Sequence, residues 1–191
     1  DYQNLSYAKE YISFVDNIYK KEKDLRSSSE LSQNVAKYLF KLMATKDEYE
    51  VARLSLKAEL DSAINMEFGK SAKINYMLHP PFLKAMENIP ILNMIPGVKS
   101  KLALGSWFKV FYVMLKNMKF LRGTPFDFMA WFSNDVRKAD SKALNHYKSI
   151  LMNNIDEIGN GKYQDLKDFS VLPDIIRGYE EVRLETMNEY Y

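Results

Sequence analysis

Apolar residues recur at three- and four-residue spacing along most of this sequence, which is the pattern of amphipathic helices. Gly and Pro, the residues that most often interrupt helices, number only 7 and 6 among 191 residues and gather at a few places. The sequence therefore predicts a mainly α, multi-helix domain.

The first part of the chain predicts two helices. The first runs from Leu5 to about Glu22. Its predicted buried stripe is Leu5, Ala8, Tyr11, Ile12, Val15, Ile18 and Tyr19. Ser29 is expected to cap the second helix, which the charged string after residue 44 allows to continue beyond Leu54. The predicted buried face of this helix is Leu31, Val35, Tyr38, Leu39, Leu42 and Met43.

The middle of the chain changes character. A helix is expected over Leu60–Phe68, with Gly69 as its C-cap. Alternating residues over 73–78 then predict a short strand that ends before His79-Pro80-Pro81, because prolines disfavour a helix there. Residues 101–104 are its expected partner, so one short β-hairpin is added to the helical prediction, with helices covering one of its faces.

The remaining helices are predicted over Ser106–Phe120, Pro125–Ser133 and Val136–Ile155. The last helix is expected to open at Leu172-Pro173-Asp174. The 106–120 helix is apolar almost all round, with three lysines. This favours a buried core helix with snorkelling lysines over a membrane-surface or calmodulin-target helix.

Composition excludes several kinds of site. The absence of Cys rules out, within this chain, a Cys-ligated iron–sulfur cluster, a thiolate zinc site and a Cys nucleophile. A net charge of +2 gives no reason to expect a nucleic-acid partner, and no apolar run is long enough to predict a membrane span. A cytoplasmic protein is expected. The missing initiator Met predicts a piece of a longer chain.

Basic residues are concentrated between Pro81 and Arg122, where Glu87 is the single acidic residue. Acidic residues outnumber basic ones after Pro173. One interpretation is two complementary surfaces of a single domain. The other is a basic docking face for an acidic partner or a larger assembly. The basic residues are Lys84, Lys99, Lys101, Lys109, Lys116, Lys119 and Arg122.

Lys46–Leu54 is the densest charged string. Glu50 stands four residues after Lys46 and three before Arg53, so a helix there is expected to have an exposed face on which these charges form ion pairs. Its carboxylates could act as general acid and base only in a pocket that shifts the pKa of one of them, so a solvated or interdomain face is favoured.

His79 has no second His or Cys nearby in sequence that could complete a set of metal ligands. Hydrogen bonding to the backbone is its expected role.

Several segments, taken together in order and spacing, resemble the C-terminal region of indolepyruvate ferredoxin oxidoreductase, a 2-oxoacid:ferredoxin oxidoreductase. The longest is Lys46-Asp47-Glu48-Tyr49-Glu50-Val51-Ala52-Arg53-Leu54. The match extends over about residues 34–182. The other segments are residues 34–44, Leu78-His79-Pro80-Pro81, Phe120-Leu121-Arg122-Gly123-Thr124 with Phe126-Asp127, and residues 172–179.

The resemblance implies a non-catalytic domain of an enzyme that oxidatively decarboxylates aryl 2-oxoacids. Thiamine diphosphate, magnesium and iron–sulfur clusters are implied for the whole enzyme and none for this chain, which has no thiamine motif. Residues 1–30 would be a linker helix from an upstream domain, and 31–191 the helical C-terminal domain. The implied partners are upstream catalytic domains or subunits. Ferredoxin would bind the whole enzyme and would be a partner of this chain only in that sense. Neither nucleic acid nor a membrane is expected as a partner.

A structural or assembly role is therefore expected, without catalytic residues in this chain. The candidate interdomain face consists of Lys46, Asp47, Glu48, Glu50, Arg53, His79, Arg122 and Arg177. The alternative is a small-molecule or CoA-binding domain, in which the basic 84–122 segment meets phosphates beside the aromatic helix. A free-standing enzyme would need a complete pocket around His79.

Overall fold

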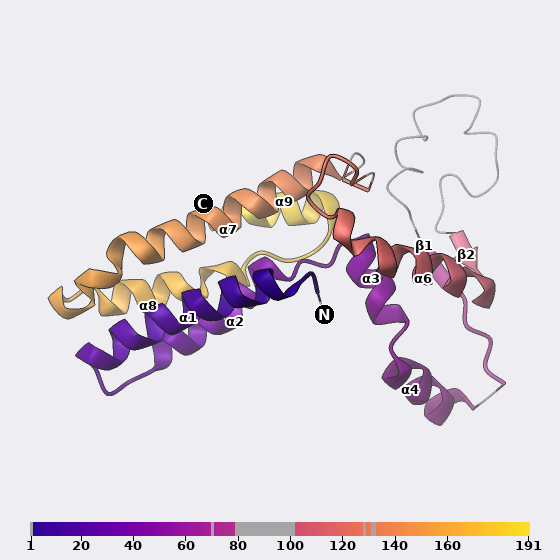
Figure 1. Ribbon diagram of the computed structural model, residues 1–191, viewed down its shortest axis with the longest axis horizontal. Helices are drawn as coiled ribbons and strands as arrows, with labels where there is room; N and C mark the ends of the chain where they lie inside the picture. The colour runs from indigo at the N-terminus through magenta and orange to yellow at the C-terminus, as the bar shows by residue number, and fades with distance from the viewer. Residues whose placement is uncertain (1, 70, 79–101, 128, 131–132) are drawn as a thin grey trace. The chain divides into compact units, whose positions relative to one another are not determined.

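The structure, a computed structural model, describes residues 2–69, 71–78, 102–127, 129–130 and 133–191. The described chain is mainly helical, as predicted (Figure 1). It divides into two compact units. Unit 1 comprises residues 1–45 and 134–191, and unit 2 comprises residues 46–133. Among the described residues, no helix is both long and apolar enough to span a membrane.

Unit 1 is built from helices of both ends of the chain: α1 (Leu5–Leu25), α2 (Glu30–Met43), α7 (Asn134–Asn154), α8 (Tyr163–Val171) and α9 (Glu180–Tyr190). The 3-10 helices Ile155–Asn160 and Leu172–Asp174 lie on either side of α8. All six apolar residues predicted to be buried on α2 are buried. On α1, however, four of the residues predicted to be buried are exposed, because the buried face is centred on Phe14, Ile18 and Glu22. The exposed residues are Leu5, Ala8, Ile12 and Tyr19.

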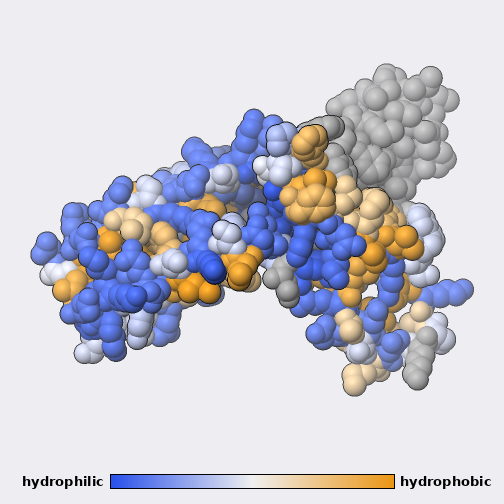
Figure 2. Space-filling model, in the orientation of Figure 1, coloured by the Kyte–Doolittle hydropathy of each residue, from blue (hydrophilic) through white to orange (hydrophobic). Residues whose placement is uncertain are grey.

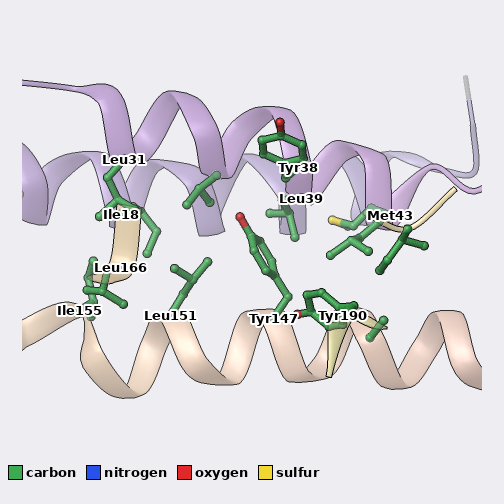
Figure 3. Close-up of a cluster of buried hydrophobic side chains, with 14 of the residues drawn as sticks. Ile18, Leu31, Tyr38, Leu39, Met43, Tyr147, Leu151, Ile155, Leu166 and Tyr190 are labelled. Atoms are coloured by element: carbon green, nitrogen blue, oxygen red, sulfur yellow. The ribbon is translucent and has the colours of Figure 1, made fainter. Parts of the chain in front are cut away.

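The core of unit 1 lies between α1 and α2 on one side and α7 and α8 on the other. Figure 3 shows Tyr147 and Leu151 of α7 pointing toward Leu39 of α2, with Ile18 and Ile155 at one end. The Tyr147 hydroxyl is buried and donates a hydrogen bond to the Ser170 carbonyl oxygen at 2.9 Å. Two segments distant in sequence therefore share one core.

Glu22 ties three elements of unit 1 together. Its side chain is fully buried and its carboxylate accepts hydrogen bonds from the Leu31 N–H at 2.9 Å and the Ser32 N–H at 2.8 Å. The Tyr163 hydroxyl donates a third, at 2.8 Å. Ser29 occupies the predicted cap position of α2, but its side chain caps no helix N–H. The capping acceptor is supplied by α1 instead.

Unit 2 contains α3 (Glu48–Ser55), α4 (Ala58–Phe68) and α6 (Lys109–Asn117), with 3-10 helices at Ser106–Phe108 and Met118–Leu121. Strands β1 (Tyr76–Leu78) and β2 (Leu102–Leu104) pair antiparallel, with Tyr76 opposite Leu104. The predicted strand pair is thus confirmed, although β1 is shorter than predicted. Tyr49, Ala52, Phe108, Tyr112, Leu115 and Met129 form the core.

Three helix predictions are wrong. The helix after Ser29 ends at Met43, because Asp47 starts the separate helix α3 by accepting the Glu50 N–H at 2.9 Å. The described residues of the predicted helix 125–133 form turns, in which the Asp127 carboxylate accepts backbone N–H groups. The helix expected from Leu172 is a 3-10 turn followed by a break, and α9 begins only at Glu180.

The predicted linker at 1–30 does not coincide with a boundary between the units, because α1 contributes Ile18 and Glu22 to the interior of unit 1. A connection from this helix to an upstream domain stays a prediction. Gly69 ends α4 with φ of 82°, as its predicted capping role requires.

Candidate functional site

The charged string predicted as an exposed helix face forms α3 and the residue before it. The Arg53 guanidinium donates to both carboxylate oxygens of Glu50, from Nε at 2.8 Å and from Nη2 at 2.6 Å. The hydrogen bond to Glu50 is the largest cause of a raised pKa of the Arg53 guanidinium. The predicted Glu50–Arg53 pair is therefore confirmed. The predicted exposure is wrong, because Glu50 is buried and Arg53 is largely covered.

A second ion pair joins the start of α3 to the end of the 3-10 helix after α6. Arg122 donates to the Asp47 carboxylate from Nε at 2.5 Å and from Nη2 at 2.8 Å. Each side chain is only 10% exposed. The guanidinium carbon also lies 5.7 Å from the centre of the Tyr49 ring. A bidentate pair of this kind fixes the orientation of both partners as well as their distance.

Asp127 extends this arrangement, and its role was not predicted. The carboxylate is almost completely buried and accepts the Tyr49 hydroxyl at 2.8 Å. Its other oxygen accepts the Gly123 N–H at 3.1 Å. We call Asp47, Tyr49, Glu50, Arg53, Arg122 and Asp127 the α3 polar cluster. The signal available in sequence was that Tyr49 and Asp127 lie within two of the segments that carry the resemblance.

The α3 polar cluster uses its carboxylates to hold hydrogen-bond donors of the same chain. Asp47 both caps α3 and binds Arg122, Glu50 binds Arg53, and Asp127 binds Tyr49 and Gly123. Among the described residues, no group of three or more His, Asp or Glu side chains is arranged to hold a metal ion. The arrangement is therefore suited to fixing the turns around α3.

The other predicted face residues have different positions. Lys46 is exposed and precedes α3, so it is not part of the predicted helical pair with Glu50. Glu48 is half-buried in the first turn of α3. Arg177 belongs to unit 1, where its guanidinium donates to the Asp174 carboxylate at 2.8 Å and lowers the pKa of that carboxyl. His79 lies outside the described residues.

Two basic residues of the predicted phosphate-binding segment already bind carboxylates. Lys109 Nζ lies 2.9 and 3.0 Å from the two oxygens of Asp61, and this hydrogen bond raises the pKa of the lysine. Arg122 binds Asp47. Lys84, Lys99 and Lys101 lie outside the described residues.

The helix that contains Lys109 also differs from prediction. Only one side of α6 is buried, through Tyr112 and Leu115, whereas Val110 and Met114 are exposed. The expectation of a core helix buried all round is therefore wrong.

His146 has an aromatic environment. Its Nδ1 lies 3.2 Å from the Tyr190 hydroxyl, and its ring packs edge-on against Phe169 and Tyr191. These contacts join α7 to α8 and to the end of the chain. His146 therefore has a packing role in unit 1.

Comparison with known proteins gives one result. No curated protein and no solved structure matches this chain. A model of a family of unknown function, DUF6537, matches residues 1–191, which include both units and the α3 polar cluster. This chain therefore belongs to the DUF6537 family of unknown function.

Proposed function

We propose that this chain is a non-catalytic helical domain of an indolepyruvate ferredoxin oxidoreductase-like enzyme, with a structural role in positioning or assembling its catalytic domains. The observation that carries the proposal is the α3 polar cluster. Asp47 and Tyr49 come from one segment that resembles that enzyme, and Arg122 and Asp127 come from another. The residues that support the resemblance thus contact one another and stabilise the fold.

The chemistry of the whole enzyme is part of the same proposal. Thiamine diphosphate, magnesium and iron–sulfur clusters would be held by other domains, which would decarboxylate the aryl 2-oxoacid and pass electrons to ferredoxin. This chain has no Cys with which to ligate a cluster. Its contribution would be a surface on which those domains are held, in a cytoplasmic enzyme.

The structure changes which residues should be used to test the interdomain face. Asp47 and Arg53 form largely covered ion pairs within unit 2, so charge reversal there is expected to destabilise the unit, and its effect could not be told apart from loss of assembly. Lys46 and Arg177 are exposed members of the predicted face. Their substitution changes surface charge and leaves the bonds of the α3 polar cluster intact.

The test is copurification of the chain with the thiamine- and cluster-bearing domains, combined with an assay of aryl 2-oxoacid-dependent ferredoxin reduction. We expect Lys46→Glu and Arg177→Glu to lower copurification and activity at unchanged helix content. Lys20→Glu, at another exposed position, is the matched control. A chain that does not copurify with these domains would contradict the proposal. If both variants assemble normally, Lys46 and Arg177 do not belong to the interdomain face, and the assembly role is then judged by copurification alone.

The alternative CoA-binding function has less support, since Lys109 and Arg122 bind Asp61 and Asp47. A saturable thermal shift with coenzyme A, lost on substitution of Lys109 and Lys116 by Glu, would favour this alternative. Absence of a shift with coenzyme A, thiamine diphosphate or aryl 2-oxoacids would reject it.

A further inference from the structure

Two cations from distant parts of the sequence converge on Asp174 in unit 1. Lys41 Nζ donates to the main-chain carbonyl oxygen of Asp174 at 3.0 Å and lies 3.6 Å from its carboxylate. Arg177 donates to the same carbonyl oxygen from Nε at 3.0 Å and to the carboxylate from Nη2 at 2.8 Å. Because Lys41 Nζ and Arg177 Nε share one acceptor oxygen, the fold holds two positive charges side by side.

Lys37 adds a third cation. It stands four residues before Lys41 in α2 and so lies on the same side of the helix. The pKa of the Asp174 carboxyl is lowered most by its hydrogen bond with Arg177, and the charge of Lys37 also contributes. Among the described residues, Asp174 is the one carboxylate that forms an ion pair with any of these three cations. We call Lys37, Lys41 and Arg177 the cation cluster, which has an excess of two positive charges over Asp174.

This excess is not explained by a need to fix the fold. Arg183 and Asp140, which form a one-to-one ion pair with each side chain only 15% exposed, show what a structural pair in unit 1 looks like. In the cation cluster, partial burial lowers the pKa of Lys41, and the charges of Arg177 and Arg183 act in the same direction. The surroundings of Lys41 thus disfavour its charge although Asp174 is beside it, and a further anion would offset this effect.

The rest of the unit 1 surface provides the comparison. Figure 2 shows that hydrophilic residues cover most of unit 1 on the face in view, so an exposed cation does not by itself indicate a ligand. Lys20 and Lys21, for example, pair with separate carboxylates, those of Asp16 and Asp156. The cation cluster differs because its members share one carboxylate. It is also accessible, since the Arg177 side chain is 70% exposed and that of Lys41 33%.

We propose that the cation cluster binds a phosphate group. A phosphate monoester has about 1.5–2 negative charges at neutral pH, which matches the excess of two, whereas a single carboxylate would offset only half of it. The Arg177 guanidinium is suited to paired hydrogen bonds with phosphate oxygens, and the two lysines are suited to binding as point charges. This inference concerns unit 1 alone and does not rest on the proposed enzyme.

The first test is isothermal titration calorimetry of the full chain with inorganic phosphate, in a buffer whose ionic strength is kept constant with chloride. We expect saturable binding of one phosphate per chain. Sulfate, which is also a tetrahedral dianion, is expected to compete with phosphate. Acetate, a monoanion, is expected to compete much less at the same concentration, because it offsets only one of the two excess charges.

The second test removes one cation. Lys41→Met keeps the apolar stem of the side chain and is expected to raise the dissociation constant for phosphate at least about tenfold, since it removes a charged donor. Lys21→Met is the matched control, because Lys21 pairs with Asp156. Figure 3 shows Ile155, the residue before Asp156, at the opposite end of the core from Met43, which follows Lys41 by two residues.

The third test removes the competing carboxylate. Asp174→Asn leaves the main-chain carbonyl oxygen that Lys41 and Arg177 share, and raises the excess to three positive charges. We expect it to lower the dissociation constant for phosphate at least about threefold, a gain that a purely structural role of Asp174 does not predict. Asp156→Asn makes the same change in net charge away from the cluster and is expected to leave the affinity unchanged. Thermal unfolding followed by circular dichroism establishes that every variant is folded.

Two phosphate monoesters distinguish the source of the phosphate group. Tighter binding of a phosphoserine peptide than of glycerol phosphate would support the site and indicate a phosphorylated protein as the ligand. Tighter binding of glycerol phosphate would support the site and indicate a small phosphorylated metabolite.

Three results would overturn the proposal. The first is the absence of saturable phosphate binding by the folded chain. The second is an affinity that Lys41→Met and Asp174→Asn change no more than their controls do. The third is binding of a glutamate-rich peptide in the absence of phosphate binding, which would assign the cluster to the carboxylates of a protein partner. Because these measurements use this chain alone, such results would not affect the proposed assembly role.

Discussion

Glu22 is a buried carboxylate whose partners are all hydrogen-bond donors. It receives the first free N–H groups of α2 and the hydroxyl of Tyr163. The first turn of a helix has no intrahelical acceptors for its N–H groups, and an anion there is favoured by the helix dipole as well. Glu22 therefore supplies from α1 the cap that the sequence predicted at Ser29.

Glu22→Ala is expected to destabilise unit 1 by about 2–4 kcal/mol, because it leaves two helix N–H groups without an acceptor in a buried place and removes the shorter of two hydrogen bonds of the Tyr163 hydroxyl. Glu22→Gln retains one acceptor oxygen and should cost less. Urea unfolding followed by circular dichroism measures both. Glu30→Ala, at an exposed position eight residues later, is the control and should cost about 0.5 kcal/mol or less. Equal effects at the two positions would contradict the capping role.

The burial of Tyr147 leads to a prediction of how the stability of unit 1 changes at alkaline pH. Burial raises the pKa of its phenol well above the ordinary value. A folded-state pKa above the unfolded one means that the unfolded chain loses its proton first as pH rises, so stability is complete below about pH 10 and falls above it. Burial raises the pKa of Tyr190 in the same direction. We therefore expect these phenols to ionise together with unfolding.

Alkaline titration monitored by tyrosinate absorbance and circular dichroism checks this expectation. Tyr147→Phe should make stability fall less steeply above about pH 10, although it also removes the hydrogen bond to Ser170. Tyr19→Phe is the control at an exposed tyrosine. If all tyrosines ionise while the helices stay intact, the expectation that the Tyr147 phenol ionises only with unfolding is wrong.

At the scale of elements, the structure separates helices that the apolar pattern joins. Between the 3-10 turn at Leu172–Asp174 and α9, Gly178 adopts φ of 78°. A Cβ on Gly178 would lie 2.6 Å from Cγ1 of Val182. The chain direction at this break therefore depends on glycine for both backbone conformation and space.

Gly178→Ala is expected to cost about 1–3 kcal/mol, from left-handed strain and the contact with Val182. Gly159→Ala is the matched control within unit 1, because a Cβ there would meet Leu25 at an ordinary 3.8 Å and φ is not positive. Thermal unfolding of both variants checks the prediction. A Gly178→Ala variant as stable as the control would mean that the break tolerates a side chain.

The start of α3 provides a second prediction for an element. Asp47→Ala removes both the cap of α3 and the partner of Arg122, and should destabilise unit 2 by about 3–5 kcal/mol. Asp47→Asn keeps a good capping side chain and loses only the ion pair, so it should be milder by about 1 kcal/mol. Tryptophan fluorescence during urea unfolding reports unit 2, because Trp107 and Trp131 fall in its sequence range. Equal losses in the two variants would exclude the cap.

At the scale of the whole molecule, unit 1 is assembled from the two ends of the chain. Its core contains Ile18 and Leu39 from the first part and Tyr147, Leu151 and Met187 from the second. The core residues of unit 2 lie in a continuous stretch of sequence. Each unit thus has its own buried cluster, which is the requirement for independent folding.

A variant in which a flexible Gly/Ser linker replaces residues 46–133 is expected to retain a cooperative helical fold, because the core of unit 1 uses no residue from the deleted range. Thermal unfolding followed by circular dichroism measures it. Adding Leu39→Ala to this variant should lower its stability by about 2–5 kcal/mol, since Leu39 is fully buried. Loss of helix structure in the parent deletion would show that unit 1 needs unit 2.

The sequence by itself determined the helical class, the buried face of α2, the end of α4 at Gly69 and the pairing of β1 with β2, because these depend on local periodicity and turn chemistry. Tertiary structure alone decided that Glu22 caps α2, that Asp127 binds Tyr49 and that Asp47 binds Arg122. These contacts join residues far apart in sequence, and their hydrogen bonds decide where helices end when apolar spacing would let them continue.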